Sequence, residues 1–235
     1  MNNIPDKSID MILCDLPYGT TTCKWDSIIP FDKLWKEYHR ITKDNAAIVL
    51  FGTEPFSSYL RTSNINQYRY DIIWEKERVT NFFFVKKQIA KCHEVISVFY
   101  KKQPTYNPQM QYIEGKKAWK RKGGTLMKNS LYEGQDMIEK DREGSELRYP
   151  RSVQKFSMHN NGLLHPTQKP VDLLEFLINT YTNENDVVLD NTMGSGSTGE
   201  AALKLGRKFI GMELDEKYFE IASNRINEVS QTLVK

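Results

Sequence analysis

Residues 187–204 constrain the fold of this chain more than any other stretch. An apolar run of strand length, Val187–Leu189, ends on Asp190 and passes into a loop with three closely spaced glycines. The loop leads into an Ala- and Leu-rich segment that suits a helix. In an open α/β sheet, such a strand, turn and helix bring backbone N–H groups to a ligand at the carboxyl edge. The pattern predicts a nucleotide-like cofactor site, although glycines alone also fit a turn with positive φ.

The length of the chain, 235 residues, suits one well-buried α/β core with an insertion. The most apolar run, 46–51, is far shorter than the ~20 residues of a membrane span, and we expect no membrane segment and no secretory leader. The three cysteines and four histidines are dispersed along the chain. We therefore expect neither a disulfide framework nor a metal site, and a reducing, cytoplasmic location.

A second motif follows the first predicted strand. Residues 9–13 are apolar and run into Asp15-Leu16-Pro17-Tyr18 and a glycine, which end the strand. The Asp15 carboxylate, the Leu16 carbonyl and the Tyr18 ring are therefore expected at the carboxyl end of a strand, the edge where α/β proteins bind ligands. Taken alone, the motif also fits a polar turn with a packing tyrosine.

Helical and strand patterns alternate through the first hundred residues. A helix is predicted over 31–41 and the start of another over 55–60, and strands are predicted over 46–51, 70–74 and 95–100. Strands separated by helical patterns favour a doubly wound sheet. We therefore predict an α/β fold with a mostly parallel sheet.

The character of the sequence changes between residues 101 and 164. Hydrophobic periodicity fades, and from 86 to 128 there are eleven basic residues against two acidic ones. Basic and aromatic residues interleaved in a loop-rich insert suit a nucleic-acid surface, although a solvated charged insert has the same composition. The basic residues that we assign to such a surface are Lys116, Lys117, Lys120, Arg121 and Lys122.

The segment 165–170, His-Pro-Thr-Gln-Lys-Pro, precedes a predicted amphipathic helix over 171–179. Its two prolines fix the backbone before the helix. Thr167 and Lys169 are therefore available to face the glycine loop.

A second strand with an acidic end, 207–215, follows the glycine loop and precedes a helix predicted over 216–229. Glu213 lies roughly 20 positions beyond the loop, where a carboxylate can accept hydrogen bonds from ribose hydroxyls. The alternative, a helix-capping or solvent-facing carboxylate, is weakened because the acidic strand end, the glycines and Glu213 occur in the right order.

In this order the motifs resemble those of the S-adenosylmethionine-dependent DNA amino-methyltransferases, which methylate adenine N6 or cytosine N4. Residues 15–18 look like the Asp-Pro-Pro-Tyr catalytic motif, and 190–196 look like the Asp-x-Phe-x-Gly-x-Gly cofactor loop. Residues 165–170 resemble the motif that precedes that loop, and 211–215 the ribose-binding strand end. With the catalytic motif first and the cofactor loop last, the chain is similar to the permuted β group, which implies a Rossmann-like methyltransferase fold.

The resemblance also implies a role for each matched position. The catalytic residues are Asp15, Leu16, Pro17 and Tyr18. The cofactor-binding residues are Asp190, Asn191, Thr192, Met193, Gly194, Ser195, Gly196, Ser197, Thr198, Glu213, Leu214, Thr167 and Lys169. The chain would comprise a catalytic half (1–100), a target-recognition insert (101–164) and a cofactor-binding half (165–235) of the same core.

The chain departs from the family pattern in three places. Leu16 replaces the first motif proline, which keeps the carbonyl acceptor and loses rigidity. Asn191-Thr192 replaces the usual Pro-Phe, which predicts a lost apolar contact to the cofactor and a lower affinity. Family members usually carry an acidic segment upstream of the first strand, and this chain starts shortly before it, so we expect a less complete adenine pocket.

The implied reaction is methylation of an exocyclic amine on a base that has left the duplex. The Asp15 carboxylate and the Leu16 carbonyl would bind both amine hydrogens, and Tyr18 would stack on the flipped base. Because the motif begins with Asp rather than Ser, the resemblance implies adenine N6 in double-stranded DNA. The alternatives are cytosine N4, an RNA or protein amide, or an inactive DNA-binding relative, which Asn191-Thr192 keeps open. Homodimers are common in the resembled group.

Overall fold

A computed structural model describes most of the chain. The chain forms two compact units, and the smaller of them is described mainly as backbone. The described residues are 1–20, 26–112, 119–121, 126–127, 137–138, 142–144, 146–158 and 168–233. The larger unit comprises Met1–Asn107 and Ser152–Lys235, and the smaller one Pro108–Arg151. Within the described part of the chain, no helix has both the length and the apolar character needed to cross a membrane.

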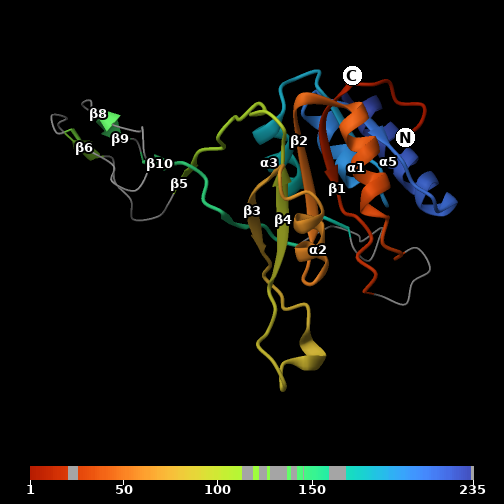
Figure 1. Ribbon diagram of the computed structural model, residues 1–235, viewed down its shortest axis with the longest axis horizontal. Helices are drawn as coiled ribbons and strands as arrows, with labels where there is room; N and C mark the ends of the chain where they lie inside the picture. Colours follow the sequence, from red (N-terminus) through yellow and green to blue (C-terminus); the bar gives the residue numbers. More distant parts are fainter. Residues whose placement is uncertain are drawn as a thin grey trace. The chain divides into compact units, whose positions relative to one another are not determined.

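The larger unit is built on a seven-stranded sheet with the order β11-β3-β4-β2-β1-β12-β13 (Figure 1). The strands are β1 (Ile9–Cys14), β2 (Thr42–Gly52), β3 (Tyr68–Glu75), β4 (His93–Phe99), β11 (Val153–Lys155), β12 (Val187–Asp190) and β13 (Lys208–Gly211). β4 runs antiparallel to β2 and β3, and the other neighbouring pairs are parallel. The predicted mostly parallel sheet is confirmed.

Helices cover both faces of this sheet. They are α1 (Phe31–Ile41), α2 (Phe56–Ser63), α3 (Val171–Tyr181), α4 (Ser197–Lys204) and α5 (Glu216–Leu233). α1 and α2 pack on the face that Ile12 joins, whereas α3 and α4 pack on the face of Met11 and Leu13. Because both faces are covered, the central strands are apolar over their buried stretches, 11–14 in β1 and 46–51 in β2, as the strand-length apolar runs indicated.

Three elements differ most from the sequence-based boundaries. β2 begins at Thr42, directly after α1, and α5 extends to Leu233. β13 ends at Gly211, so the prediction of a strand that reaches its acidic end was wrong. The chain leaves the sheet there because Glu213 turns back and accepts the N–H groups of the two residues that follow it.

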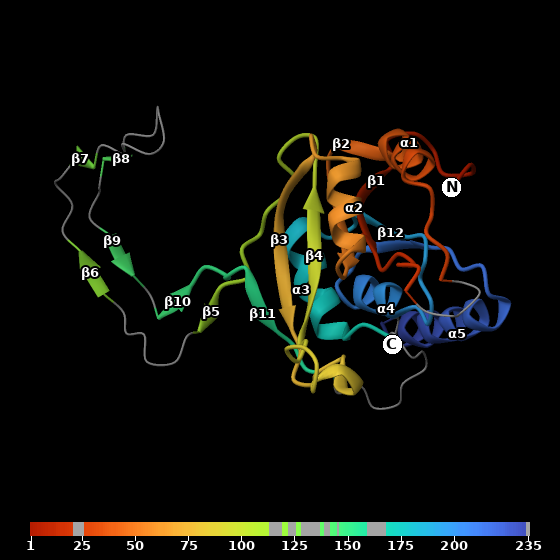
Figure 2. The same cartoon turned by 60° about the horizontal axis from the view of Figure 1, so that its bottom comes forward.

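β11 is the one main-sheet strand that falls inside the stretch 101–164, where no strand was predicted. It pairs in parallel with β3, a strand some eighty positions earlier in the chain (Figure 2). With three residues and an exposed Val153 it is too short for a periodic pattern.

Among its described residues, the smaller unit forms three two-stranded antiparallel ladders. Its strands are β5 (Gln111–Tyr112), β6 (Trp119–Arg121), β7 (Leu126–Met127), β8 (Met137–Ile138), β9 (Arg142–Gly144) and β10 (Leu147–Arg148). β5 pairs with β10, β6 with β9 and β7 with β8. In sequence, each pair therefore lies between the two strands of the pair before it.

Candidate active site

The site lies at the topological switch point of the sheet, where the strand order proceeds in opposite directions from two neighbouring strands. β1 and β12 are parallel neighbours, and the chain proceeds from β1 to β2 on one side and from β12 to β13 on the other. In open α/β sheets, ligands bind in the crevice outside the carboxyl ends of such strands. A cavity of ≈ 400 Å³ lies there, lined by residues 15–18, 190–195 and 213–215 among others.

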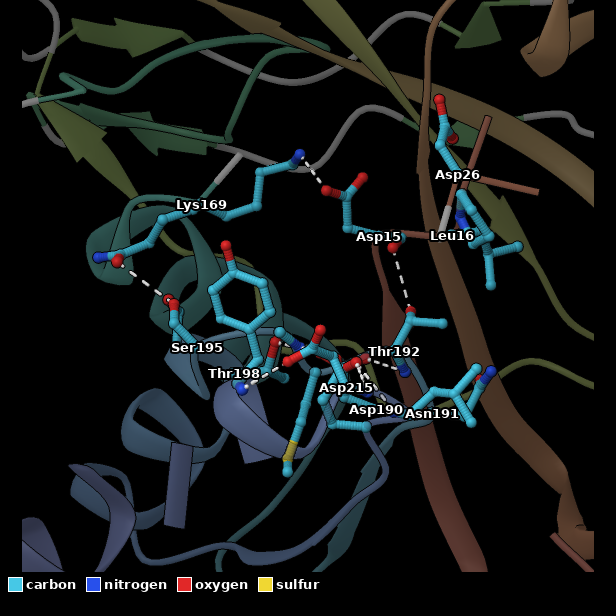
Figure 3. Close-up of a pocket in the computed structure, with 18 of the residues that line it drawn as sticks. Asp15, Leu16, Asp26, Lys169, Asp190, Asn191, Thr192, Ser195, Thr198 and Asp215 are labelled. Carbon is cyan, nitrogen blue, oxygen red and sulfur yellow. Dashed lines mark hydrogen bonds and ion pairs between the residues drawn. The ribbon is translucent and has the colours of Figure 1, made fainter. Parts of the chain in front are cut away.

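The glycine loop begins at the buried carboxylate of Asp190, which two neutral donors hold. The Thr192 N–H donates to Oδ1 at 3.0 Å, and the Thr198 hydroxyl donates to Oδ2 at 2.7 Å (Figure 3). Burial raises the pKa of Asp190 to about 6, and the hydrogen bonds from Thr198 and Thr192 limit the rise. The carboxylate is thus mostly ionised at neutral pH and fixes both ends of the loop.

Gly196 is the point at which the loop turns into α4. Its φ of 78° is in the left-handed region, and a Cβ there would lie 2.9 Å from the Cβ of Ala222 on α5. Both the conformation and the close approach require glycine. The two alternatives that the sequence left open, a strained turn and a ligand loop, are therefore both features of one segment, because the loop also lines the cavity.

Glu213 lies just past the end of β13 and ties the loop to that strand end. Its Oε2 accepts the Gly194 N–H at 2.8 Å, and its Oε1 accepts the N–H groups of Leu214 at 2.8 Å and Asp215 at 2.9 Å. A carboxylate oxygen has two acceptor sites, so Oε2 keeps one toward the cavity that it lines. Such a site suits a ribose hydroxyl.

The turn after β1 brings Asp15 into the same cavity. The Tyr18 hydroxyl donates to Asp15 Oδ1. The Lys169 Nζ lies 2.5 Å from Asp15 Oδ2 (Figure 3). The Thr192 hydroxyl donates to the main-chain carbonyl of Asp15 at 3.0 Å. The residue at which the family pattern expects an aromatic side chain thus links the glycine loop directly to the turn.

Tyr18 packs its ring on Phe56 of α2, with ring centroids 4.9 Å apart. Burial, followed by the charges of Asp15 and Glu94, raises the pKa of the Tyr18 phenol well above its ordinary value. The phenol therefore stays protonated and remains a donor to Asp15. Leu16 is buried in the core beneath the turn, and Pro17 lines the cavity.

A row of alternating charges leads away from Asp15. Lys169 lies 3.4 Å from Glu94 Oε2 as well as beside Asp15, and the other Glu94 oxygen pairs with Lys76. Burial opposes the charged form of Lys169, but Asp15 and Glu94 raise its pKa above the ordinary value. Burial likewise opposes ionisation of Glu94, yet Lys169 and Lys76 bring its pKa below the ordinary value. We name Lys76, Glu94, Lys169 and Asp15 the charge row.

Sequence reasoning missed two members of the charge row. Lys76 follows the carboxyl end of β3, and Glu94 is the second residue of the antiparallel strand β4. In the sequence, Glu94 was only one of two acidic residues in the basic stretch 86–128, and Lys76 was singled out by no pattern. Only the strand order, which puts both positions at the edge that holds Asp15, could have identified them.

The remaining predicted residues are distributed around the cavity. Met193, Ser195 and Ser197 line it, and the Ser195 hydroxyl donates to Gln168 Oε1 at 3.3 Å. Asn191 lines it too, and its side-chain oxygen accepts the Tyr38 hydroxyl at 2.6 Å. Several predicted positions, Thr167, Lys116, Lys117 and Lys122, lie outside the described residues, and Lys120 and Arg121 are described only as backbone of β6. Over the described part of the chain, no group of three or more His, Cys, Asp or Glu residues could hold a metal ion.

A doubly wound sheet with a glycine turn, an acidic strand end and a carboxylate after the next strand defines a nucleotide-cofactor-binding α/β enzyme. The Asp-Leu-Pro-Tyr turn lies in the same cavity and resembles the catalytic motif of the DNA amino-methyltransferases, which favours that family among such enzymes. The family model described as "DNA methylase" for N6/N4 methyltransferases matches residues 9–224. The chain belongs to this family.

Two curated relatives match nearly the whole chain. The type II methyltransferase M.HinfI of Haemophilus influenzae is 30% identical over 262 residues, which cover 97% of this chain and 66% of the relative. The DNA adenine methyltransferase YhdJ of Escherichia coli is 28% identical over 248 residues, covering 98% of this chain and 80% of the relative. This chain thus spans about two thirds of the first relative and four fifths of the second.

Solved structures share the fold. The PvuII cytosine-N4-specific DNA methyltransferase has a TM-score of 0.67 at 14% identity, covering 98% of this chain and 86% of that one. The complex of M1.HpyAVI with S-adenosylmethionine has a TM-score of 0.61 at 22% identity, covering 96% and 90%. The predicted Rossmann-like fold is confirmed, as is the predicted family, that of the N6/N4 DNA amino-methyltransferases.

Proposed function

We propose that this chain methylates the N6 amine of an adenine in double-stranded DNA at a specific sequence. The observation that carries the proposal is the position of Asp15 and Leu16 in one cavity with the glycine loop of residues 190–198. The motif begins with Asp rather than Ser, and one relative is named as a DNA adenine methyltransferase. Both facts support adenine over cytosine.

In this proposal the glycine loop and Glu213 hold S-adenosylmethionine. The cavity of ≈ 400 Å³ lies within the usual range for small-molecule sites, roughly 300–1,000 Å³. The spare acceptor site of Glu213 suits a ribose hydroxyl, and the loop from Asp190 to Thr198 would surround the methionine part. The cofactor supplies a methyl group that is already activated on a sulfonium, so the protein has mainly to orient the two reactants.

The role of Asp15 follows from its hydrogen bonds. Tyr18 and Lys169 each take one acceptor site on different oxygens, which fixes the carboxylate and leaves each oxygen one further site. One such site would receive an amine hydrogen of the target base, and the Leu16 carbonyl would receive the other. Drawing both hydrogens away from the ring favours a localised lone pair on nitrogen, aimed at the methyl group. Asp15 is also placed to take the proton that the amine gives up.

The stretch 101–164 is the proposed target-recognition insert between the catalytic half (1–100) and the cofactor half (165–235). Its basic residues, Lys116, Lys117, Lys120, Arg121 and Lys122, would neutralise phosphates. Duplex affinity should then fall steeply when salt rises from about 50 to 200 mM, as expected for several phosphate contacts. Fluorescence anisotropy with a labelled duplex measures this slope, and a flat response would argue against DNA as the partner of this segment.

Nucleoside analysis tests the proposed reaction. The protein is incubated with S-adenosylmethionine carrying a labelled methyl group and with unmethylated plasmid DNA, which is then digested to nucleosides. We expect the label in N6-methyladenine. Label in N4-methylcytosine would establish the cytosine reaction instead, and label that appears only with RNA or a protein substrate would reject DNA as the substrate.

A further inference from the structure

The loop that joins β3 to β4 carries a group of exposed aromatic side chains at its tip. Phe82, Phe83 and Phe84 form a short 3₁₀ turn, η1 (Phe82–Phe84), and are 70%, 94% and 56% exposed. Ile89 of the same loop is 93% exposed. Single exposed apolar residues are ordinary, whereas a contiguous exposed group marks a surface that another molecule covers. We call residues 76–92 the aromatic loop.

The aromatic loop has its own hydrogen-bonded stem. The Asn81 side chain donates to the Ile89 carbonyl at 3.0 Å and accepts the Lys91 N–H at 2.7 Å. The Thr80 N–H donates to the Lys91 carbonyl at 2.8 Å. The loop extends beyond the ends of β3 and β4, where it is drawn in yellow (Figure 1). The phenylalanines are therefore presented outward by a closed stem.

The stem starts at the edge of the sheet that holds the active site. β3 runs antiparallel to β4, β4 antiparallel to β2, and β2 parallel to β1, so β3 and β1 end at the same edge. Lys76 and Glu94 flank the stem and belong to the charge row that reaches Asp15. Lys91 also donates to Thr53, just past the end of β2. The aromatic loop thus projects from the edge at which a target base must enter.

The charge of the aromatic loop identifies the kind of partner. The basic residues Lys76, Arg78, Lys86, Lys87 and Lys91 stand against one acidic residue, Glu77. Two of the lysines, Lys86 and Lys87, follow the aromatic tip after a single intervening residue, Val85. An apolar tip within a cationic loop matches a partner with negative charge outside and flat apolar surfaces inside, which describes the phosphates and stacked bases of duplex DNA.

We propose that the aromatic loop inserts Phe83 into the base stack of duplex DNA beside the flipped target base, an inference that rests on the proposed function. Proteins that open a duplex place apolar wedges between base steps, and a flipped base leaves a gap that loses its stacking. Phe83, the most exposed of the three rings, fills that gap. Lys86 and Lys87 contact the adjoining phosphates.

The test compares Phe83→Ala with Ile65→Ala on two duplexes that carry the recognition site. Ile65 is 60% exposed in the turn before β3, at the opposite end of that strand, so its truncation controls for loss of exposed apolar surface. One duplex is fully paired, and the other has an abasic site opposite the target base, which makes flipping easier. We expect Phe83→Ala to lower kcat/KM about tenfold or more on the paired duplex and about threefold or less on the abasic one. Ile65→Ala should stay within about twofold of the wild type on both duplexes.

Several results would overturn the inference. Equal losses of Phe83→Ala on both duplexes, or no loss on the paired duplex, would exclude a role in base flipping. Equal losses together with a change from dimer to monomer by light scattering would assign the tip to a second copy of this chain. If the wild type methylates neither duplex, the proposed function itself fails, whereas an active wild type with an unaffected Phe83→Ala variant rejects only the wedge.

Discussion

The two halves of the cavity hold their carboxylates by different means. On the cofactor side, Asp190 and Glu213 are held by neutral donors, five in all, of which four are backbone N–H groups and one is the Thr198 hydroxyl. On the catalytic side, Asp15 is held by the Tyr18 hydroxyl and by a buried cation, Lys169. The carboxylates of the cofactor side are thus positioned mainly by backbone N–H groups, whereas the carboxylate of the catalytic side is positioned by a neighbouring opposite charge and a hydroxyl.

This difference predicts how each half responds to change. Backbone donors stay in place when a distant side chain is removed, so the cofactor side should keep its shape when the catalytic side is altered. The members of the charge row depend on one another, because loss of one leaves a neighbour with an uncompensated charge at low exposure.

The largest expected effect comes from Asp15→Ala. Asp15→Ala removes the proposed acceptor for the target amine, and methyl transfer should fall by about a thousandfold or more, the upper part of the range for acid–base and orienting groups. The measurement is a single-turnover assay at saturating cofactor and DNA. Asp15→Asn is the matched control for shape, because it keeps one oxygen acceptor and should retain more activity than Asp15→Ala. Normal turnover by Asp15→Ala would remove Asp15 from the mechanism.

A smaller effect is expected when the charge row is broken at Glu94. Glu94→Gln leaves Lys76 and Lys169 without their shared counter-charge and should lower the free energy of unfolding by about 3 kcal/mol. Asp44→Asn is the control, because Asp44 pairs with three lysines at the solvent-exposed surface, and its loss should cost clearly less than the loss of Glu94. Urea denaturation measures both. Equal costs would show that the charge row behaves as a surface network.

The smallest expected effect concerns pH and the buried Asp190. Its folded-state pKa of about 6 lies above the unfolded value, so the folded protein binds the proton more tightly. The stabilisation from this group is therefore present at low pH and is lost as pH rises through about 6. Relative to Asp190→Asn, the wild type should gain about 1 kcal/mol of stability at pH 5 compared with pH 7.5. Urea denaturation at the two pH values checks this, and an unchanged difference would contradict a raised pKa.

The sequence predicted the halves of the site unequally. Strand ends and glycine spacing are local patterns, so residues 15–18, the glycine loop and Glu213 were found, and the structure brings them around one cavity. The other two members of the charge row, Glu94 and Lys76, were not found, because they reach the site through an antiparallel strand order that no local pattern encodes. Thr192 looked like a weakness in the motif, and only the fold shows that its hydroxyl donates to the Asp15 carbonyl.

The fold itself was largely predictable because its central strands and helices are long and apolar on defined faces. α1 begins and ends where its apolar spacing indicated, whereas β11 pairs through only three residues. The aromatic loop carried no periodic signal, and the exposure of Phe83 could be recognised only from the structure.

Calorimetric titration with S-adenosylmethionine tests the contrast between the two halves most directly. Asp15→Ala should bind the cofactor within about threefold of the wild type, because its backbone still receives the Thr192 hydroxyl. Glu213→Ala, which leaves three backbone N–H groups without their acceptor, should bind about tenfold more weakly or worse. If Asp15→Ala loses cofactor affinity as much as Glu213→Ala does, the two halves are not independent and the account is contradicted.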